Sequence, residues 1–309
     1  MSVGSGKIGK KPEEKMMGLL TNIVFSAAKN RVLSRGTGDA GENPATFDAA
    51  SYQDWRTSEL EAQYRDHFSA ADLLGKDVLD FGCGEGDLSF LVANLGARSV
   101  KAVDVDAERV ESARERARDR KLRIQPEFFV ASTTTKIDLP DESVDVILCF
   151  DVLEHILDYE AVLPEWRRVL RPGGRIMIWW VPWLHPYGHH IESLVPLPWV
   201  HAFLPDSVLT RTCARVYDLP EFKPRVWDLD EQGNKKPNKW WNMKGLPGVN
   251  KLTMSRFEEI IGFLDLHIDK RQCYGFRTSR FRPLTEALAN LPVLREFFNS
   301  YITYELRKD

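Results

Sequence analysis

The sequence has few cysteines, no long apolar run and no marked excess of charge of either sign. Its four cysteines are scattered and none belongs to a Cys-x-x-Cys pair, which disfavours a disulfide framework or a zinc–thiolate site. No apolar run reaches the roughly 18 residues that a membrane span needs. A net charge of −3 argues against a nucleic-acid-binding surface as the main feature, so no nucleic acid partner is expected.

The composition otherwise fits a chain with a substantial core. At 309 residues and 43% hydrophobic content, the chain can form one large domain or two small ones. We interpret the four cysteines as reduced thiols, and a cytoplasmic location follows from that interpretation.

The most informative stretch runs from Val78 to Ser89. An apolar run contains Asp80 near its end, glycines follow at alternate positions 82, 84 and 86, and a helix-like segment begins at Leu88. Glycine allows positive φ angles and close approach of a ligand to the main chain. The open N–H groups at the start of the helix then face whatever lies on the turn. This pattern predicts a strand, a tight turn and a ligand-binding helix start.

A second apolar run ends in an acid twenty residues after Gly84. This run covers residues 99–104 and ends in Asp104. An acid at the end of a second strand can accept both hydroxyls of an adenosine ribose. The two runs together predict that an adenosine-containing ligand lies across the glycine turn.

The spacing Asp-x-Gly-x-Gly-x-Gly resembles the first motif of the class I S-adenosylmethionine (SAM) methyltransferases. It differs from the Gly-x-Gly-x-x-Gly of dinucleotide folds. The sequence Leu-Arg-Pro-Gly-Gly at residues 170–174, a predicted tight turn into a fifth strand at 176–181, resembles a late signature of the same family. The resemblance covers about 75–181 and 251–306. It implies an α/β fold with a Rossmann-like seven-stranded sheet, in which the seventh strand, expected at about 297–306, runs antiparallel between the fifth and sixth.

The resemblance also implies a cofactor, SAM, with S-adenosylhomocysteine as its product. The cofactor-binding residues expected from it are Asp80, Gly82, Cys83, Gly84, Gly86, Asp104, Val105, Ser132, Thr133, Phe150 and Val152. One position departs from the family. Many relatives carry an acid near the end of the third strand that bonds the adenine amino group, whereas this chain has Ser132 and three threonines there.

The segment after the fourth strand holds the first candidates for catalysis, Asp151, Glu154 and His155. The favoured interpretation is the start of a helix whose histidine packs near the homocysteine end of the cofactor. The alternative is a divalent metal site, as in related enzymes with Glu-x-x-Glu-His, with three ligands on one helical face. Here the first acid is an aspartate, so the metal is not favoured. Without metal, the predicted general base is His155, His189 or His190, and Asp151 is a further catalytic candidate.

Residues 182–250 interrupt the alternation of strands and helices. They hold nine prolines and five of the nine tryptophans. We predict an inserted cap that binds the methyl acceptor, with a structural insert that has its own small core as the alternative. The predicted organisation is an N-terminal helical extension (1–50) followed by a methyltransferase domain (51–309) that contains this cap.

The predicted activity is methyl transfer to an oxygen, either hydroxyl or carboxyl, of a metabolite, glycan or lipid-like precursor. Alternatives are C- or N-methylation of a small molecule, methylation of protein or RNA, and SAM binding without catalysis. The acceptor, the pathway and the oligomeric state are left open.

Residues 13–34 have the spacing of a helix, with apolar side chains that recur every three or four positions. We expect this helix to pack on the core or over the cofactor mouth. Lysines at positions 7, 10, 11 and 15 leave a helix on a membrane surface as the alternative.

Overall fold

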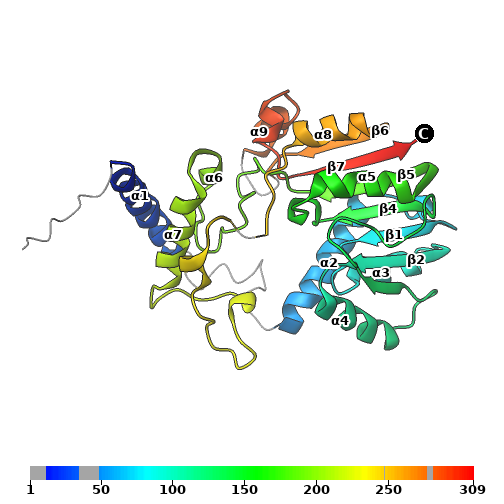
Figure 1. Ribbon diagram of the computed structural model, residues 1–309, viewed down its shortest axis with the longest axis horizontal. Coiled ribbons are helices and arrows are strands. Elements are labelled where there is room, and N and C mark those ends of the chain that lie inside the picture. Colours follow the sequence, from blue (N-terminus) through cyan, green and yellow to red (C-terminus); the bar gives the residue numbers. More distant parts are fainter. Residues whose placement is uncertain (1–11, 35–48, 247, 277–280) are drawn as a thin grey trace, which may run out of the picture. The chain divides into compact units, whose positions relative to one another are not determined.

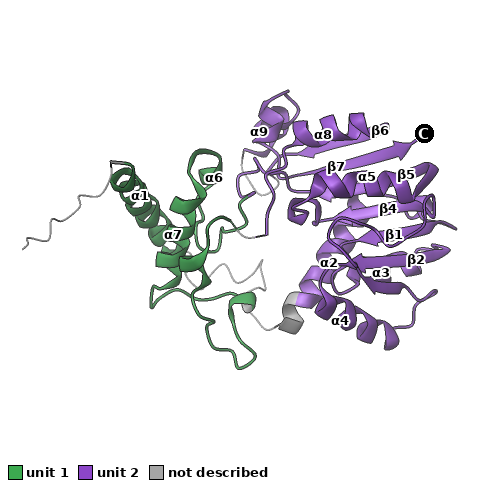
Figure 2. Ribbon diagram, viewed as in Figure 1, with its two compact units in different colours: residues 1–49, 189–247 green, residues 50–188, 248–309 purple. Residues whose placement is uncertain are grey.

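The computed structural model describes residues 12–34, 49–246, 248–276 and 281–309. It divides the chain into two compact units (Figure 2), each treated by itself below. The smaller unit holds residues 1–49 and 189–247, and the larger unit holds residues 50–188 and 248–309. The polypeptide therefore crosses from one unit to the other three times.

The larger unit is built on a seven-stranded sheet with the strand order β3-β2-β1-β4-β5-β7-β6 (Figure 1). Its strands are β1 (Asp77–Phe81), β2 (Ser99–Asp104), β3 (Glu127–Val130), β4 (Val144–Phe150), β5 (Leu170–Trp180), β6 (Leu266–Tyr274) and β7 (Tyr301–Lys308). The pairs among β1 to β5 are parallel, whereas β7 runs antiparallel to both β5 and β6. The predicted class I methyltransferase topology is confirmed, including the place and direction of the last strand.

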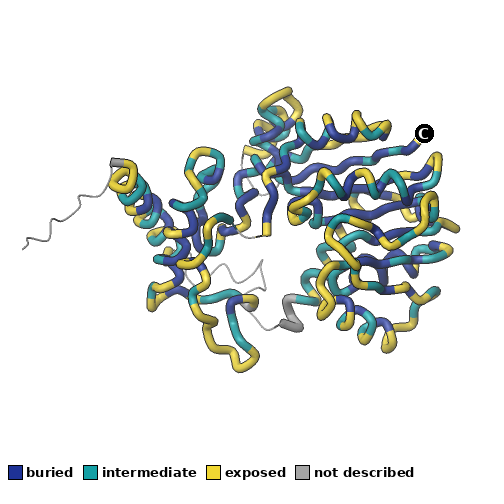
Figure 3. The backbone as a smooth tube through the Cα atoms, viewed as in Figure 1, coloured by how far each residue is buried: buried dark blue, intermediate teal, exposed yellow. Residues whose placement is uncertain are grey.

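Helices cover both faces of the sheet, because successive side chains of a buried parallel strand point to opposite faces and both sets are apolar. On one face, Ile147 and Cys149 of β4 pack in a core with α5 (Tyr159–Val169) and α8 (Met254–Phe263). On the other face, Val146 and Leu148 belong to the core shared with α2 (Ala49–His67) and α3 (Asp87–Asn94). The next helix, α4 (Ala107–Arg118), packs on Phe90 and Phe128. Figure 3 shows the central strands as mostly buried segments.

The turn predicted at 171–175 is part of β5 instead. Leu170 already pairs with Val144, and the next pairs resume at Val146 and Arg175, so three additional residues bulge from β5. Gly173 takes a φ of 74° within this bulge. Before β7 the chain forms α9 (Arg282–Ala289) and the short 3₁₀ helix η6 (Leu294–Glu296), and β7 begins four residues later than predicted.

The smaller unit has a helical core of its own. The long helix α1 (Pro12–Ser34) packs along α7 (Asp206–Tyr217), and the short helices α6 (Val200–Phe203), η4 (Val226–Asp228) and η5 (Lys239–Asn242) belong to the same unit. Val24 and Ala28 of α1 are buried there beside Leu209 and Cys213 of α7. Among the described residues, no helix combines the length and the apolar character required to cross a bilayer.

Candidate active site

A tight turn at the carboxyl end of β1 is fixed by main-chain hydrogen bonds. The N–H groups of Gly82 and Cys83 both donate to the carbonyl of Val103 on β2, at 2.8 and 3.0 Å. Gly86 donates to the carbonyl of Cys83 at 2.9 Å, and Phe90 donates to Gly86 as α3 begins. The turn is therefore tied to β2 at one end and to the helix at the other.

The three glycines of this turn have different surroundings, although all have positive φ angles. A Cβ atom on Gly82 would lie 2.5 Å from both methyl carbons of Val152, and one on Gly86 would lie about 3 Å from the Phe90 and Phe128 rings. A Cβ atom on Gly84 would meet nothing within 4 Å. Gly82 and Gly86 therefore serve internal packing, and the main chain at Gly84 is open to a ligand.

These surroundings predict different outcomes for two alanine variants. Gly82→Ala is expected to lower the free energy of unfolding by about 2–4 kcal/mol, because a strained φ and a steric overlap add. Gly84→Ala is expected to cost only about 1 kcal/mol, from the positive φ alone. Urea unfolding of both variants measures the difference, and equal losses would contradict the assignment of Gly84 to the open side of the turn.

Asp104, at the end of β2, holds the turn in shape. Its carboxylate accepts from the N–H of Gly84 at 2.8 Å and from the N–H of Asp106 at 3.0 Å. The next side chain, Val105, is exposed although it is apolar. A partly exposed acid with an exposed apolar neighbour can bind a polar ribose and an apolar base face at once.

Asp80 is buried beneath the same turn. It accepts a hydrogen bond from the hydroxyl of Ser89 on α3. Burial raises the pKa of Asp80 to about 7, with smaller contributions from Asp104 and Asp87, while the bond from Ser89 opposes the shift. The hydrogen bond between Ser89 and Asp80 thus joins α3 to β1 and helps to hold the glycine turn in position.

Because the pKa of Asp80 is raised in the folded protein, we expect the free energy of unfolding to depend on pH. The folded protein keeps this proton up to about pH 7, whereas the unfolded chain releases it near its ordinary value of 3.8. The contribution of Asp80 to stability should therefore be largest at low pH and fall by about 1.4 kcal/mol per pH unit between those two pKa values. The difference in unfolding free energy between wild type and Asp80→Asn, followed from pH 4 to 8, measures this slope. A difference independent of pH would contradict it.

The loop after β3 contains an acid that sequence reasoning missed. Asp138 accepts from the main-chain N–H of Ser132 at 2.9 Å and from its hydroxyl at 2.8 Å. Thr133 accepts from the N–H of Thr135. A carboxylate therefore does lie beside the residue that follows the third strand by two positions, although it belongs to a residue six positions further along the chain. An acid shortly after the threonine run was the only sequence signal for it.

The end of β4 carries an ion pair to α2. Asp151 has a φ of 57°, and its N–H donates to the carbonyl of Trp179 on β5. Its carboxylate lies 2.6 Å from the guanidinium of Arg56. Just before it, the Phe150 ring packs against Tyr64 and Phe68. The side chain of Asp151 is thus directed to α2 at the carboxyl edge of the sheet.

Two further carboxyl groups belong to this cluster. Glu154 is 3% exposed, and no N–H or O–H group of the described residues donates a hydrogen bond to either of its carboxyl oxygens. Burial, and then the nearby Asp151 carboxylate, raise the pKa of Glu154 well above its usual range. Burial likewise raises the pKa of Glu59 on α2, against the attraction of Arg56. With one guanidinium and three acids so close, burial and the Asp151 charge both favour the protonated form of Glu154, which can donate a hydrogen bond to Asp151.

The polar face of α2 is the largest feature that sequence reasoning missed. Thr57 and Gln53 donate to the buried carboxylate of Asp87 on α3, which is also paired with Arg116 of α4. Arg56, by contrast, reaches Asp151. The sequence signal for this polar face was a set of polar residues that recur three or four positions apart, at 53, 56, 59 and 63.

Asp151, Glu154 and His155 do not share a helical face. Only a single 3₁₀ turn, η3 (Leu153–His155), follows β4, and Asn250 fixes it by donating to the carbonyls of Leu153 and Ile156. The His155 ring contacts the carbonyl of Gly248. The helical ligand arrangement considered from the sequence is therefore wrong. In the described part of the chain, no group of three or more His, Cys, Asp or Glu side chains is placed to hold a metal ion.

His189 and His190 lie in the smaller unit. His189 is buried, accepts from the N–H of Ile191 at 3.1 Å and contacts the carbonyl of Leu197 through its other ring nitrogen. Burial lowers the pKa of His189 to about 3, and the neighbouring His201 adds to the shift. A neutral ring with both nitrogens engaged suits a structural histidine. His190 is exposed, with a φ of 52°.

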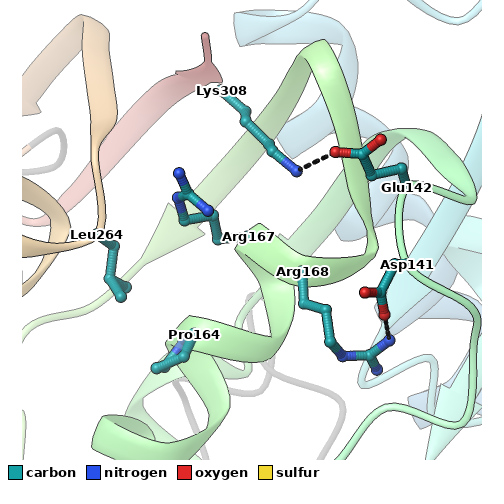
Figure 4. Close-up of a pocket in the computed structure, with 7 residues that line it drawn as sticks. All are labelled: Asp141, Glu142, Pro164, Arg167, Arg168, Leu264 and Lys308. Carbon is teal, nitrogen blue, oxygen red and sulfur yellow. Dashed lines mark hydrogen bonds and ion pairs between the residues drawn. The ribbon is translucent and has the colours of Figure 1, made fainter.

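A cavity of about 510 Å³ lies at the other end of the parallel strands, away from their carboxyl ends (Figure 4). It is lined by the loop before β4, the last turns of α5 and the end of β7, at Asp141, Glu142, Pro164, Arg167, Arg168, Leu264 and Lys308. Arg168 pairs with Asp141, and Lys308 pairs with Glu142. In open parallel sheets ligands bind at the carboxyl ends of the strands. We therefore place the candidate site at the carboxyl ends of the strands, where the glycine turn and the charged cluster lie, and not at this cavity.

Residues 79–178 match the protein family described as "Methyltransferase domain". A probable S-adenosylmethionine-dependent methyltransferase of Mycolicibacterium smegmatis is 40% identical over 104 residues, which are 34% of this chain and 37% of that protein. A ubiquinone biosynthesis O-methyltransferase of Xanthomonas oryzae is 37% identical over 114 residues, which are 37% of this chain and 46% of that protein. The matched segment thus spans less than half the length of these relatives.

One solved structure with a similar fold is a geranyl diphosphate methyltransferase in complex with SAM. The two chains superpose with a TM-score of 0.52 and 14% sequence identity, over 91% of this chain and 95% of the other. At this identity the likeness concerns the fold.

Proposed function

We propose that this chain, a member of the class I SAM-dependent methyltransferase superfamily, transfers the methyl group of SAM to an oxygen of a small-molecule acceptor. The observation that carries the proposal is that two groups of polar residues, one suited to the cofactor and one to the acceptor, lie at the carboxyl ends of neighbouring strands. The glycine turn with Asp104 lies at the ends of β1 and β2, and the cluster of Arg56, Asp151 and Glu154 lies at the end of the adjacent β4.

The residues at the turn fit SAM. The open main chain at Gly84 admits a ligand, and the carboxylate of Asp104 can accept from the ribose hydroxyls. Exposed Val105 offers an apolar contact to the adenine ring. Asp138, beside Ser132, is our candidate acceptor for the adenine amino group, since a carboxylate oxygen that already accepts one hydrogen bond can accept another.

The cluster at the end of β4 fits the acceptor side of the reaction. When bound, SAM supplies a methyl group activated by the sulfonium charge. Asp151 takes the proton of the acceptor hydroxyl or orients it, and Arg56 holds the Asp151 carboxylate in position. Protonated Glu154 donates to Asp151 and keeps a second negative charge out of the site.

We retain the assignment of residues 182–250 to acceptor binding as part of the proposal. The part of that segment in the smaller unit offers exposed aromatic surface, for example at Trp241, whose ring nitrogen donates to Asp218 at 2.8 Å. An indole face suits a sugar, an aromatic ring or an apolar chain. The nature of the acceptor as a small molecule rests on this surface and on the likeness to an O-methyltransferase.

Incubation of the purified protein with methyl-tritiated SAM and a dialysed extract of its source tests the proposal. Label should enter the small-molecule or lipid pool, and EDTA should leave the rate unchanged. Label confined to protein or nucleic acid would contradict the proposed acceptor class. Loss of label with EDTA and its return with Mg²⁺ would contradict the assignment of Asp151 as a base that acts without metal.

A further inference from the structure

Helix α1 carries apolar side chains on two faces, and the described residues pack against only one of them. Val24 and Ala28 are buried in the core of the smaller unit, with Met17, Leu20 and Phe25 half-buried around them. On another face, Met16, Leu19 and Ile23 are 57%, 60% and 57% exposed. Positions i, i+3 and i+7 lie on one line along a helix, so these three side chains form a continuous apolar stripe.

Basic residues flank this stripe. Lys15 lies to one side of it by helical position and Arg31 lies to the other, and both are exposed. The first 35 residues of the sequence contain seven lysines and arginines against two acids, Glu13 and Glu14, although the whole chain has a net charge of −3. The apolar stripe therefore lies in a basic stretch of a chain that is acidic as a whole.

We propose that the stripe of Met16, Leu19 and Ile23 docks on an anionic lipid surface. A helix with an exposed apolar stripe and flanking lysines or arginines can lie in the plane of a bilayer interface. The apolar side chains then enter the acyl boundary, and the basic groups contact anionic headgroups. The inference does not depend on the proposed methyl transfer.

Charge distinguishes this occupant from a second copy of the chain. Two α1 helices that met through these stripes would bring their basic flanks together, and the repulsion would oppose the apolar contact. An anionic bilayer instead takes up the apolar stripe and attracts the basic residues beside it. The Glu13 and Glu14 pair lies in the first turn, where the helix dipole favours acids.

Flotation of the full chain with lipid vesicles tests the proposal. We expect binding to vesicles that contain phosphatidylglycerol, weaker binding to phosphatidylcholine alone, and release as salt increases. The triple variant Met16→Ser, Leu19→Ser, Ile23→Ser should bind roughly tenfold more weakly or not at all. Phe263→Ser, at a side chain of α8 that is 78% exposed, is the matched control and should bind as wild type does.

The variants change exposed side chains, so circular dichroism and thermal unfolding should match wild type. Three results would overturn the proposal: no binding to anionic vesicles, equal binding to neutral and anionic vesicles, or full binding by the folded triple variant. Light scattering that shows a dimer which the triple variant disperses, without vesicle binding, would overturn it in favour of a second copy.

Discussion

Replacing Asp104 with alanine is expected to weaken SAM binding by about 100-fold or more, while the sheet and its helices stay folded and any structural change is confined to the glycine turn. The substitution removes the carboxylate that accepts from Gly84 and Asp106, and with it the proposed acceptor for both ribose hydroxyls. Hydrogen bonds to a charged group contribute about 1.5–3 kcal/mol each, and about 2.7 kcal/mol corresponds to 100-fold in affinity. Isothermal titration of SAM into wild type and variant measures the loss.

The matched control for this prediction is Asp119→Ala. Asp119 is exposed at the end of α4, away from the glycine turn in the sequence and at the opposite end of that helix from Asp106. It should bind SAM as wild type does. If Asp104→Ala bound SAM within a fewfold of wild type, the glycine turn and Asp104 would not form the cofactor site.

Asp151→Asn is expected to lower kcat by at least about 100-fold while SAM affinity changes little. General-base catalysis contributes about 10²- to 10⁴-fold, and the amide cannot take a proton. The variant also removes the negative charge that pairs with Arg56 at position 151, so a modest loss of stability should accompany the loss of turnover. Single-turnover kinetics with the acceptor found in the labelling experiment, alongside SAM titration, separates the two effects.

Two further variants sharpen this test. Asp158→Asn changes an exposed aspartate that makes no capping hydrogen bond at the start of α5, and should leave kcat unchanged. Glu154→Gln replaces a carboxyl group whose pKa burial raises with an uncharged amide of similar shape, so it should fold and retain SAM binding. Wild-type kcat in Asp151→Asn would show that the acceptor oxygen needs neither a base nor an orienting group at the end of β4.

The sheet could be predicted from the sequence because its signals are local. Each apolar run of strand length can be recognised from a few consecutive residues, as can the glycine turn after Asp80 and the acid that ends the run at Asp104. Resemblance to a known family then supplied the strand order, which local patterns do not contain.

The clustered charges of the site could not be predicted, because they depend on contacts between distant parts of the chain. Arg56 and Asp151 are separated by 95 positions, and nothing in either segment specifies the other. The turn at Glu154 depends likewise on Asn250. A helical face was expected after β4, but the positive φ of Asp151 and the bonds from Asn250 produce a single 3₁₀ turn.

Isothermal titration of the full chain with SAM, S-adenosylhomocysteine and NAD tests the central claim most directly. The spacing of the glycines, the open main chain at Gly84 and the carboxylate of Asp104 predict saturable binding of SAM and S-adenosylhomocysteine at one site per chain, and no binding of NAD. Binding of NAD without SAM, or no binding of either adenosyl compound, would contradict the account.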